Sequence, residues 1–286
     1  MGKVTKDVRK TFVIRPSGRS TDYISPSFGY GCLYDCSYCY MKRHKPDGLS
    51  IAVNPHDILT AINDHATFAV VDKPNQTHAE YITYDISCNE DFALHAKYHK
   101  WEYIFDFFKE HERAMGSFAT KYVNPNLINY DPQGKIRIRF SLMPQHMSDL
   151  HEPRTTPIID RIKAIDAFID AGYDVHVNYS PIIVYKGWLE DYKEVFDMMN
   201  DYVDYKEQVL AECIFLTHEE NKHLKNLHNK PMAEKDLWQP QIQEKKKSQY
   251  GGLNIRYKLG LKRKFIKEFK ELHGAMIPWN KIRYIF

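Results

Sequence analysis

The sequence predicts an α/β fold, a partial (β/α)6 barrel of the TIM type followed by a C-terminal β-hairpin and helix. Strand-like and helix-like segments alternate about six times between residues 23 and 229, which is typical of parallel strands joined by helical crossovers. Side chains capable of chemistry follow the ends of several predicted strands, where barrel enzymes place their active sites. A basic segment near the C-terminus then breaks the alternation.

The elements are predicted from periodicity and from capping residues. A short strand at residues 23–28 leads into a cysteine-rich loop, and a helix at 55–67 follows with Asn54 as its N-cap. Further strands are predicted at 81–86, 116–121, 135–141, 174–180 and 209–217, and further helices at 94–112, 157–171, 187–202 and 219–229. A hairpin over 245–258 turns near Gly251 and Gly252, and a helix covers 261–273.

Length and composition suggest one large domain or a domain with an appendage. We expect an N-terminal arm at 1–20, the barrel at 21–230 and a C-terminal basic extension at 231–286. No apolar run approaches the roughly 18 residues that cross a bilayer, and the N-terminus lacks an apolar signal segment. We therefore expect a soluble, cytoplasmic monomer with no membrane partner.

The charge is unevenly distributed along the chain. Its net value is only +3, but residues 245–270 carry ten basic residues and one acidic residue, Glu268. The rest of the chain then has 30 basic and 36 acidic residues. A basic segment on an otherwise acidic protein favours a polyanionic partner such as nucleic acid, although a solvated helix and hairpin surface explains the charge equally well.

Three of the five cysteines, Cys32, Cys36 and Cys39, lie within eight residues. Three thiolates can hold three irons of a [4Fe–4S] cluster and leave the fourth iron open to a small molecule. A zinc site completed by His44 is an alternative. Disulfide pairing or simple burial is another, but Cys-x2-Cys closes a tight ring, and five cysteines without a signal segment suggest a reducing compartment.

Other candidate residues follow later predicted strands. Cys88 follows the second strand, Lys121 the third, Ser141 the fourth and Ser180 the fifth, which places all four at one barrel mouth with the cysteine loop. A lone thiol in this position is more often a packed core residue, and Cys213, within an apolar strand, is interpreted in that way.

The cysteine spacing resembles that of the radical S-adenosylmethionine (SAM) enzymes, and the wider pattern resembles the spore photoproduct lyase family. The matching features are the cysteine loop with Tyr38 and Tyr40, the isolated Cys88, the run Arg139-Phe140-Ser141, the stretches 171–173, 180–182 and 187–188, and the hairpin around Tyr250. The likeness covers residues from about 25 to the C-terminus. It implies the radical SAM type of partial barrel.

The resemblance implies a radical SAM carbon–carbon lyase for DNA repair. Enzymes of that family split SAM to a 5′-deoxyadenosyl radical and return the ultraviolet lesion 5-thyminyl-5,6-dihydrothymine to two thymines. Cys32, Cys36 and Cys39 would bind the cluster, Cys88 would quench the thymine radical, and Tyr38 and Tyr40 would relay a hydrogen atom. Lesion-bearing DNA and a flavodoxin- or ferredoxin-like one-electron reductant are the implied partners.

The same resemblance assigns the remaining contacts. The positions that correspond to SAM-binding residues are Lys121, Ser141, Ser180 and Asn89. The hairpin is implied to contact DNA through Lys245, Lys246, Lys247, Tyr250, Arg256 and Tyr257. Asn89, Ser180 and Gln249 depart from the residues usual in the family, which are a small hydroxyl residue, alanine and arginine. Two alternatives remain: a radical SAM enzyme acting on another nucleoside or a peptide, and a zinc-bearing nucleic-acid-binding module.

Overall fold

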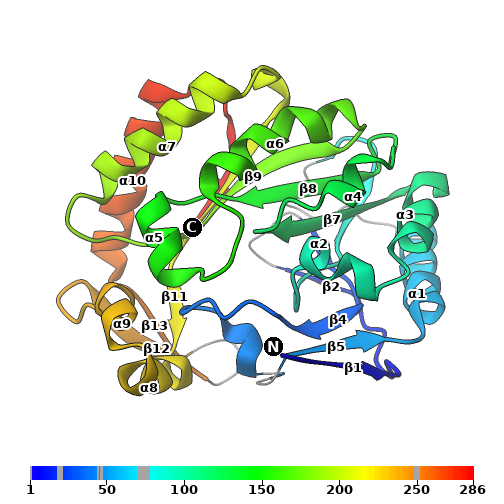
Figure 1. Cartoon of the computed structure of the whole chain (residues 1–286), viewed down its shortest axis with the longest axis horizontal. Helices are drawn as coiled ribbons and strands as arrows, with labels where there is room; N and C mark the ends of the chain where they lie inside the picture. Colours follow the sequence, from blue (N-terminus) through cyan, green and yellow to red (C-terminus); the bar gives the residue numbers. More distant parts are fainter. Residues whose placement is uncertain (1, 18–21, 44, 46–47, 70–77, 248–251) are drawn as a thin grey trace. The chain divides into compact units, whose positions relative to one another are not determined.

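The computed structural model describes residues 2–17, 22–43, 45, 48–69, 78–247 and 252–286 (Figure 1). Its described residues form two compact units. Unit 1 comprises Met1–Leu33, Met41–Phe140 and Lys163–His176, and unit 2 comprises Tyr34–Tyr40, Ser141–Ile162 and Val177–Phe286. The predicted division into arm, barrel and extension follows other boundaries and stays a prediction.

The main sheet has eight strands in the order β14-β10-β9-β8-β7-β6-β3-β2. In unit 1, β3 (Tyr23–Ile24), β6 (Ile82–Asp85), β7 (Ala114–Thr120) and β8 (Ile136–Ser141) pair in parallel, and β2 (Arg15–Pro16) adds antiparallel to β3. In unit 2, β10 (Leu210–Phe215) and β14 (Ile282–Ile285) are also parallel. The ninth strand in chain order, β9, covers Asp174–Ile182. Parallel strands alternating with helices confirm the predicted α/β class.

The strand β8 has an alternating sequence but is buried on both faces. All six of its residues are buried, including Arg137 and Arg139. Arg137 forms an ion pair of 2.6 Å with Asp174, and Arg139 lies 3.1 Å from Asp85. Buried guanidinium groups need such carboxylate partners because an unpaired buried charge is costly.

The longer helices lie at the predicted positions, except that one predicted helix is divided. The longer helices are α1 (Pro55–Phe68), α3 (Trp101–Glu110), α6 (Ile158–Asp170), α7 (Trp188–Tyr202), α8 (Glu220–Asn229) and α10 (Leu259–Met276). The shorter ones are η1 (Tyr40–Arg43), α2 (Phe92–His95), η2 (Ala96–Tyr98), α4 (Pro125–Ile128), α5 (Gln145–His151), η3 (Lys206–Gln208) and α9 (Pro231–Leu237). In unit 2, α7 and α10 run side by side (Figure 1), and Tyr192 meets Phe269 edge to face at 5.2 Å.

Two predictions about helices were wrong. The single helix expected at 94–112 is divided into α2, η2 and α3, and in the divided part His95 and His99 both contact the carboxylate of Glu90. Asn54 stands at the N-cap position of α1 but does not cap it with its side chain. Its Oδ1 instead accepts a hydrogen bond of 2.8 Å from the Arg9 backbone N–H, which joins the N-terminal segment to α1.

Each unit also has a three-stranded sheet. In unit 1, β5 (Gly48–Ala52) pairs in parallel with β1 (Lys3–Asp7) and antiparallel with β4 (Gly29–Gly31), so part of the segment expected to be an arm is a strand. In unit 2, β13 (Leu253–Tyr257) lies between β11 (Thr217–Glu219) and β12 (Gln243–Lys247). The antiparallel β12–β13 pair confirms the predicted hairpin, and its turn lies outside the described residues.

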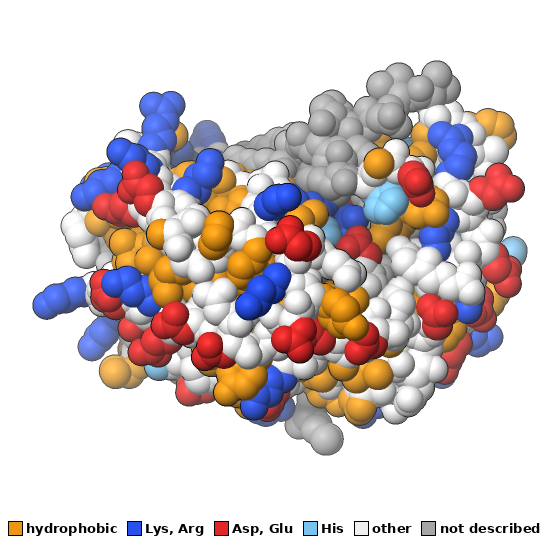
Figure 2. Space-filling model, turned by 90° about the horizontal axis from the view of Figure 1, so that it is seen from above, with side chains coloured by type: hydrophobic (Ala, Val, Ile, Leu, Met, Phe, Trp, Pro, Cys, Tyr) orange, Lys and Arg blue, Asp and Glu red, His pale blue; other side chains and the backbone are white. Residues whose placement is uncertain are grey.

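The described surface and helices bear on membrane and charge predictions. Among the described residues, no helix is both long and apolar enough to cross a membrane. Figure 2 shows one face of the molecule, on which Lys and Arg side chains are interspersed with Asp and Glu side chains. The face in this view is therefore neither mainly acidic nor mainly basic.

Candidate functional site

The cysteine loop lies between β4 and η1. Cys32 belongs to unit 1, whereas Cys36 and Cys39 belong to the part of the loop in unit 2. Cys32 and Cys36 are 7% and 6% exposed, and Cys39 is half-buried. The Cys39 backbone N–H donates to the Cys36 carbonyl at 3.2 Å, which closes a tight turn between the two thiols. The structure records all five cysteines as thiols, and His44 lies outside the described residues.

These three thiols fit a [4Fe–4S] cluster. Cysteine is the usual cluster ligand, and a compact loop rather than regular structure carries the set. Zinc accepts the same donor set.

In unit 1, the loop is held by a buried carboxylate–histidine group, which we call the Glu90 cluster (Glu90, His95 and His99). Glu90 Oε2 lies 3.1 Å from His95 Nδ1 and 2.8 Å from His99 Nε2. The Leu33 backbone N–H donates to His95 Nε2 at 3.2 Å. Because that nitrogen accepts, His95 carries its proton on Nδ1 and donates it to Glu90. The residue after Cys32 is therefore fixed through one imidazole.

The charge of Glu90 is maintained by its partners. Burial by itself raises the pKa of this carboxyl, but the positive charge of His99 and hydrogen bonds from His95 and His99 outweigh it and lower the pKa to about 2. An ionised Glu90 can accept hydrogen bonds from the N–H groups of both imidazoles. Gly29 on β4 makes room for it, because a Cβ at Gly29 would lie 2.4 Å from Glu90 Oε2.

Cys88 lies in the turn after β6, next to the cysteine loop of unit 1. The Gly31 backbone N–H donates to the Asn89 carbonyl at 3.0 Å. This bond joins the residue before Cys32 to the residue after Cys88. Cys88 is half-buried, and the Asn89 side-chain amide donates to the Ser27 hydroxyl.

Asp91 connects the turn after β6 with the end of β7. Its Oδ1 accepts from the Thr120 hydroxyl at 2.7 Å and from the Leu94 backbone N–H at 3.1 Å, and its Oδ2 accepts from the Lys121 backbone N–H at 2.9 Å. The backbone of Lys121 is therefore fixed by the same turn that carries Cys88. Both residues lie on strand-end loops of unit 1 that share Asp91 as an anchor.

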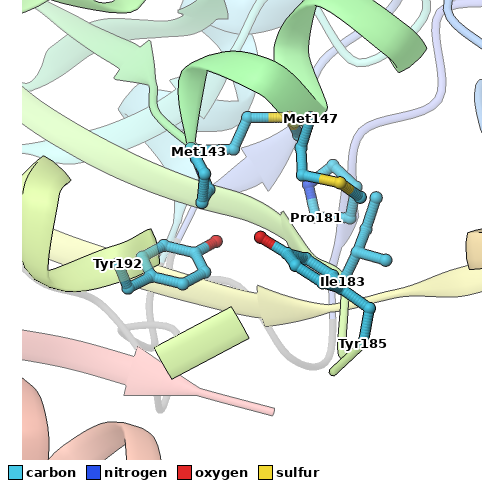
Figure 3. Close-up of a pocket in the computed structure, with 7 residues that line it drawn as sticks. Met143, Met147, Pro181, Ile183, Tyr185 and Tyr192 are labelled. Atoms are coloured by element: carbon cyan, nitrogen blue, oxygen red, sulfur yellow. The ribbon is translucent and has the colours of Figure 1, made fainter. Parts of the chain in front are cut away.

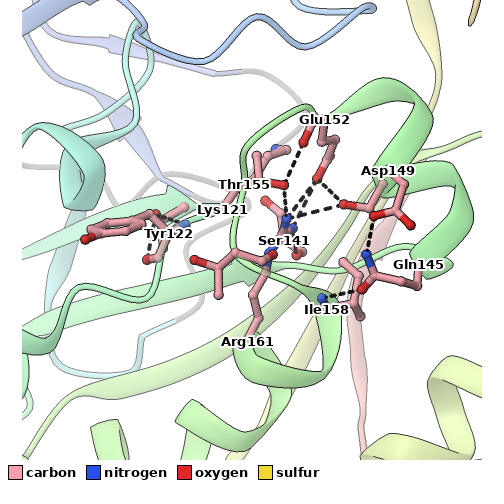
Figure 4. Close-up of polar contacts among 12 residues, drawn as sticks. Lys121, Tyr122, Ser141, Gln145, Asp149, Glu152, Thr155, Ile158 and Arg161 are labelled. Carbon is pink, nitrogen blue, oxygen red and sulfur yellow. Dashed lines mark hydrogen bonds and ion pairs between the residues drawn. The ribbon is translucent and has the colours of Figure 1, made fainter.

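In unit 2, a buried ion pair between Arg161 and Glu152 lies beside Ser141 (Figure 4). Arg161 Nη2 lies 3.1 Å from Glu152 Oε2, and both side chains are inaccessible to solvent. Arg161 Nη1 donates to the Ser141 carbonyl at 2.7 Å, and the Tyr38 hydroxyl donates to Glu152. The Ser37 backbone N–H also donates to the His151 carbonyl at 2.8 Å. The α5–α6 region thus holds the cysteine loop and the end of β8 together.

The two tyrosines of the loop have different surroundings. Burial, and then the charge of Glu152, raises the pKa of the Tyr38 phenol well above its usual range. Tyr38 is therefore neutral and keeps a hydrogen on its oxygen. Tyr40 begins η1 and is 41% exposed, so it lies nearer to the surface than Tyr38.

Ser180 stands near the end of β9, where a small apolar pocket opens in unit 2. Ser180 is half-buried and is followed by a cis peptide bond to Pro181. Figure 3 shows the hydroxyls of Tyr185 and Tyr192 facing one another across this pocket. Its lining also includes Met143, Pro144, Met147, Pro181 and Ile183. The ends of β8 and β9 therefore adjoin an apolar surface as well as the two serines.

The hairpin residues separate into exposed and buried groups. Lys245, Lys246 and Lys247 are exposed on β12, although Lys245 pairs with Glu220 and Lys246 lies 2.8 Å from Glu244. Arg256 Nη2 donates to the Lys247 carbonyl at 2.9 Å.

Tyr257 corrects one expectation. It is 3% exposed, and its hydroxyl accepts a hydrogen bond of 2.8 Å from the Val184 backbone N–H. This residue packs in the protein rather than facing a DNA surface. Tyr250 lies outside the described residues.

Sequence reasoning missed the residues that support the site. Glu90, Asp91, Glu152 and Arg161 are charged yet 0–6% exposed. The signal for the first two was the acidic pair directly after Cys88 and Asn89, at the end of a predicted strand. Glu152 and Arg161 had no local signal, because their meaning depends on a contact with Tyr38 across more than a hundred residues.

The fold and the cysteine loop together define an α/β protein of the partial-barrel class with three closely spaced cysteines after an early strand. The family model "Spore photoproduct lyase" matches residues 3–286. The chain belongs to the spore photoproduct lyase family, a radical SAM lyase family that uses an iron–sulfur cluster.

Individual relatives agree with this assignment. A spore photoproduct lyase of Bacillus subtilis (strain 168) is 28% identical over 196 residues, covering 68% of this chain and 55% of that protein. The chain thus spans about half the length of the curated relative it matches. The structure of a spore photoproduct lyase complexed with dinucleoside spore photoproduct superimposes with a TM-score of 0.85 at 20% identity, covering 99% of this chain and 82% of that one.

A second solved structure has a ligand-bound site. A spore photoproduct lyase variant with bound AdoMet and dinucleoside spore photoproduct has a TM-score of 0.83 at 18% identity, over the same shares of the two chains. At these identities the structures establish the fold, and they confirm the predicted partial-barrel class.

Proposed function

We propose that this protein is a SAM-dependent lyase that returns a thymine photoproduct in DNA, 5-thyminyl-5,6-dihydrothymine, to two thymines. The observation that carries the proposal is the 3.0 Å hydrogen bond from Gly31 N–H to the Asn89 carbonyl, which places the turn of Cys88 beside the first cysteine of the loop. A simple hydrogen abstractor needs no thiol there. A lyase that must give a hydrogen atom back to a thymine radical does.

Three cysteines would hold the cluster, and the chemistry would come from the bound group. Cys32, Cys36 and Cys39 would ligate three irons, and the cluster with SAM would supply a 5′-deoxyadenosyl radical. Lys121, Ser141, Ser180 and Asn89 are proposed to position SAM from the strand ends. The lysine suits a carboxylate and the hydroxyls suit a ribose.

The protein's own residues would handle the hydrogen atoms. Cys88 donates as a neutral thiol, so it needs no lowered pKa, unlike a nucleophilic cysteine. Tyr38, which is neutral and hydrogen-bonded to Glu152, is held in one orientation from which it can pass a hydrogen atom onward. Tyr40, more exposed, is proposed as the second member of this relay.

DNA is proposed to approach through the exposed lysines of β12. Lys247 is the sharpest candidate, because Lys245 and Lys246 already have acidic neighbours. Arg256 and Tyr250 complete the proposed contact surface, and Tyr257 is left out because it is buried. The lesion must leave the duplex stack to reach a barrel mouth, which a basic hairpin at the duplex would assist.

The test of the reaction compares Cys88→Ala with Cys213→Ala. The full chain is reconstituted with iron and sulfide without oxygen, then incubated with SAM, dithionite and ultraviolet-treated dry DNA, and thymine products are measured by mass spectrometry. Cys88→Ala should keep SAM cleavage but divert the thymine radical to adducts with the reductant. Cys213 is a fully buried residue of β10, so Cys213→Ala should keep the wild-type product ratio.

The outcomes separate the alternatives. Equal product ratios for Cys88→Ala and wild type would show that Cys88 only packs. SAM cleavage without repair would indicate a radical SAM enzyme for another substrate, and one zinc with no iron would indicate a zinc module.

The DNA contact has its own test. Lys247→Glu should weaken binding of duplex DNA and reduce the slope of log K against log salt by about 1, because each phosphate contact releases about 0.9 counterion. The control is Lys235→Glu, an exposed lysine on α9 outside the hairpin. Equal affinities and slopes for both variants would contradict a hairpin contact.

A further inference from the structure

The region of β11, α8 and α9 contains a second buried carboxylate–histidine group, which we call the Glu234 cluster (Glu234, His218, His223 and Asn226). Glu234 on α9 is 2% exposed. Its Oε1 lies 2.6 Å from His223 Nδ1 and 3.0 Å from His218 Nε2. Its Oε2 accepts from Asn226 Nδ2 at 2.7 Å. One carboxylate therefore joins β11, α8 and α9.

Asn226 connects the Glu234 cluster with the cysteine loop. Its Nδ2 also donates to the Ser37 carbonyl at 2.7 Å. Both partners of that nitrogen are acceptors, a carboxylate oxygen and a carbonyl oxygen, so the orientation of the amide is fixed by its contacts. The two hydrogens of the amide are both used, and Glu234 holds the amide in the position that reaches Ser37.

Lys230, between α8 and α9, holds the same loop on the other side of Cys36. Its Nζ donates to the Asp35 carbonyl at 2.7 Å and lies 2.8 Å from the Asp35 carboxylate. The carbonyls of residues 35 and 37 are thus both bound by the α8–α9 region. Cys36 lies between them, so its backbone is fixed on both sides within unit 2.

We propose that Asn226, oriented by Glu234, is a positioning residue for Cys36. The proposal rests on the function proposed above only in that Cys36 is taken as a cluster ligand. A loop already fixed before the cluster forms loses less conformational freedom on binding it, and a ligand held from behind is harder to release. Asn226 touches neither cluster nor substrate and acts through the Ser37 peptide.

The alternative interpretation of the Glu234 cluster is that it binds a metal ion. His218, His223 and Glu234 offer donor atoms within 4.8 Å of one another, and two imidazoles with one carboxylate can bind zinc. Binding through His218 Nε2 would move the proton of that ring to Nδ1. That atom is buried and has no hydrogen-bond partner among the described residues. With the proton on Nε2 and donated to Glu234, Nδ1 is instead an unprotonated acceptor, and a buried acceptor without a partner is more readily tolerated than a buried N–H donor, so the geometry favours hydrogen bonds over a metal.

The sharpest variant is Asn226→Asp, which keeps the shape but replaces a donor with an acceptor facing two oxygens. In the full chain without cluster, alkylation of Cys36 by iodoacetamide should become about ten-fold faster, because a buried acceptor loses its partner and the loop opens more often. After reconstitution, iron should be released to a chelator about ten-fold faster, and the midpoint potential of the cluster should shift. Peptide mass spectrometry reports each cysteine separately.

The matched control is Asn229→Ala, at an exposed position of the same helix. It should alkylate and release iron as the wild type does, and Cys213 should stay unreactive in every variant. If Asn226→Asp fails to fold, Lys230→Gln at a partly exposed site gives the same comparison, with faster Cys36 alkylation as its expected result.

The two proposals can fail separately. Wild-type alkylation rates at Cys36 in both Asn226→Asp and Lys230→Gln would overturn the positioning role, whatever the metal content. If the wild-type chain takes up no iron, but Cys36 is alkylated faster in Asn226→Asp than in wild type, the lyase proposal is overturned and the positioning role is supported. One zinc per chain that Glu234→Gln loses would overturn the hydrogen-bonded account of the Glu234 cluster.

Discussion

The Glu90 cluster of unit 1 and the Glu234 cluster of unit 2 solve the same problem with different chemistry. In each, a buried carboxylate accepts hydrogen bonds from two imidazoles and orients a side chain that reaches the cysteine loop. The Glu90 cluster binds a loop N–H through an imidazole nitrogen that must be unprotonated. The Glu234 cluster binds a loop carbonyl through an amide that does not titrate. The support of Cys32 therefore passes through an imidazole, whereas the support of Cys36 passes through a side-chain amide.

The two clusters also differ in how they are built. Glu90, His95 and His99 lie within ten residues, and their hydrogen bonds replace the regular helix that the sequence predicted there. The Glu234 cluster takes residues from one strand and two helices. A local cluster can form when its own segment folds, but the other needs three elements already packed. Changes in the Glu90 cluster should therefore act on one loop, and changes in the Glu234 cluster on a whole region.

The largest effect is expected for Glu90→Gln. The pKa of Glu90 is lowered from 4.5 to about 2, which corresponds to about 3 kcal/mol of folding stability. A lowered carboxyl pKa stabilises the folded state fully above pH 4.5, and this contribution is lost as pH falls toward 2. Glu90→Gln should thus be less stable than wild type by about 3 kcal/mol at pH 7, and the difference should shrink below pH 4.5.

Urea unfolding at several pH values measures this difference. Glu112→Gln, at an exposed position of the same unit, should stay within about 0.5 kcal/mol of wild type throughout. A difference between Glu90→Gln and wild type that stays constant from pH 7 to pH 3 would contradict an ionised Glu90 at the centre of the cluster.

A smaller and more local effect separates the two histidines of the Glu90 cluster. His95→Leu removes the acceptor of the Leu33 N–H, whereas His99→Leu removes only a donor to Glu90. Cys32 should be alkylated about ten-fold faster in His95→Leu, because a buried donor without a partner opens the loop, and less than about two-fold faster in His99→Leu. Equal rates in both variants would mean that stability of the cluster, and not the Leu33 contact, protects Cys32.

The sequence predicted those parts of the molecule whose cause is local. The hairpin and the helix at 55–67 were predicted because turn residues and apolar spacing lie within the segments themselves. The strand β14 has only four residues and pairs with β10 about seventy positions earlier in the chain, so no local pattern indicates it. Asn54 has the right residue type for a cap, but Arg9 competes for its oxygen from 45 residues away.

The candidate site divides in the same way. Cys32, Cys36, Cys39 and Cys88 were predicted because spacing and position after a strand carry their meaning. Glu152 and Arg161 were not, since a charged residue at the end of a short helix and another on an amphipathic helix are usually interpreted from sequence as solvated. The burial of Tyr257 was also missed, because alternation in a hairpin does not state which face is covered.

Gly29 has a consequence for how sequences of this family can diverge. Any side chain at this position would overlap the carboxylate of Glu90, since a Cβ would lie 2.4 Å from its oxygen. A larger residue at Gly29 is therefore expected together with a displaced Glu90 side chain or a smaller residue in its place. The two positions, 61 residues apart in sequence, are expected to co-vary among members of the family.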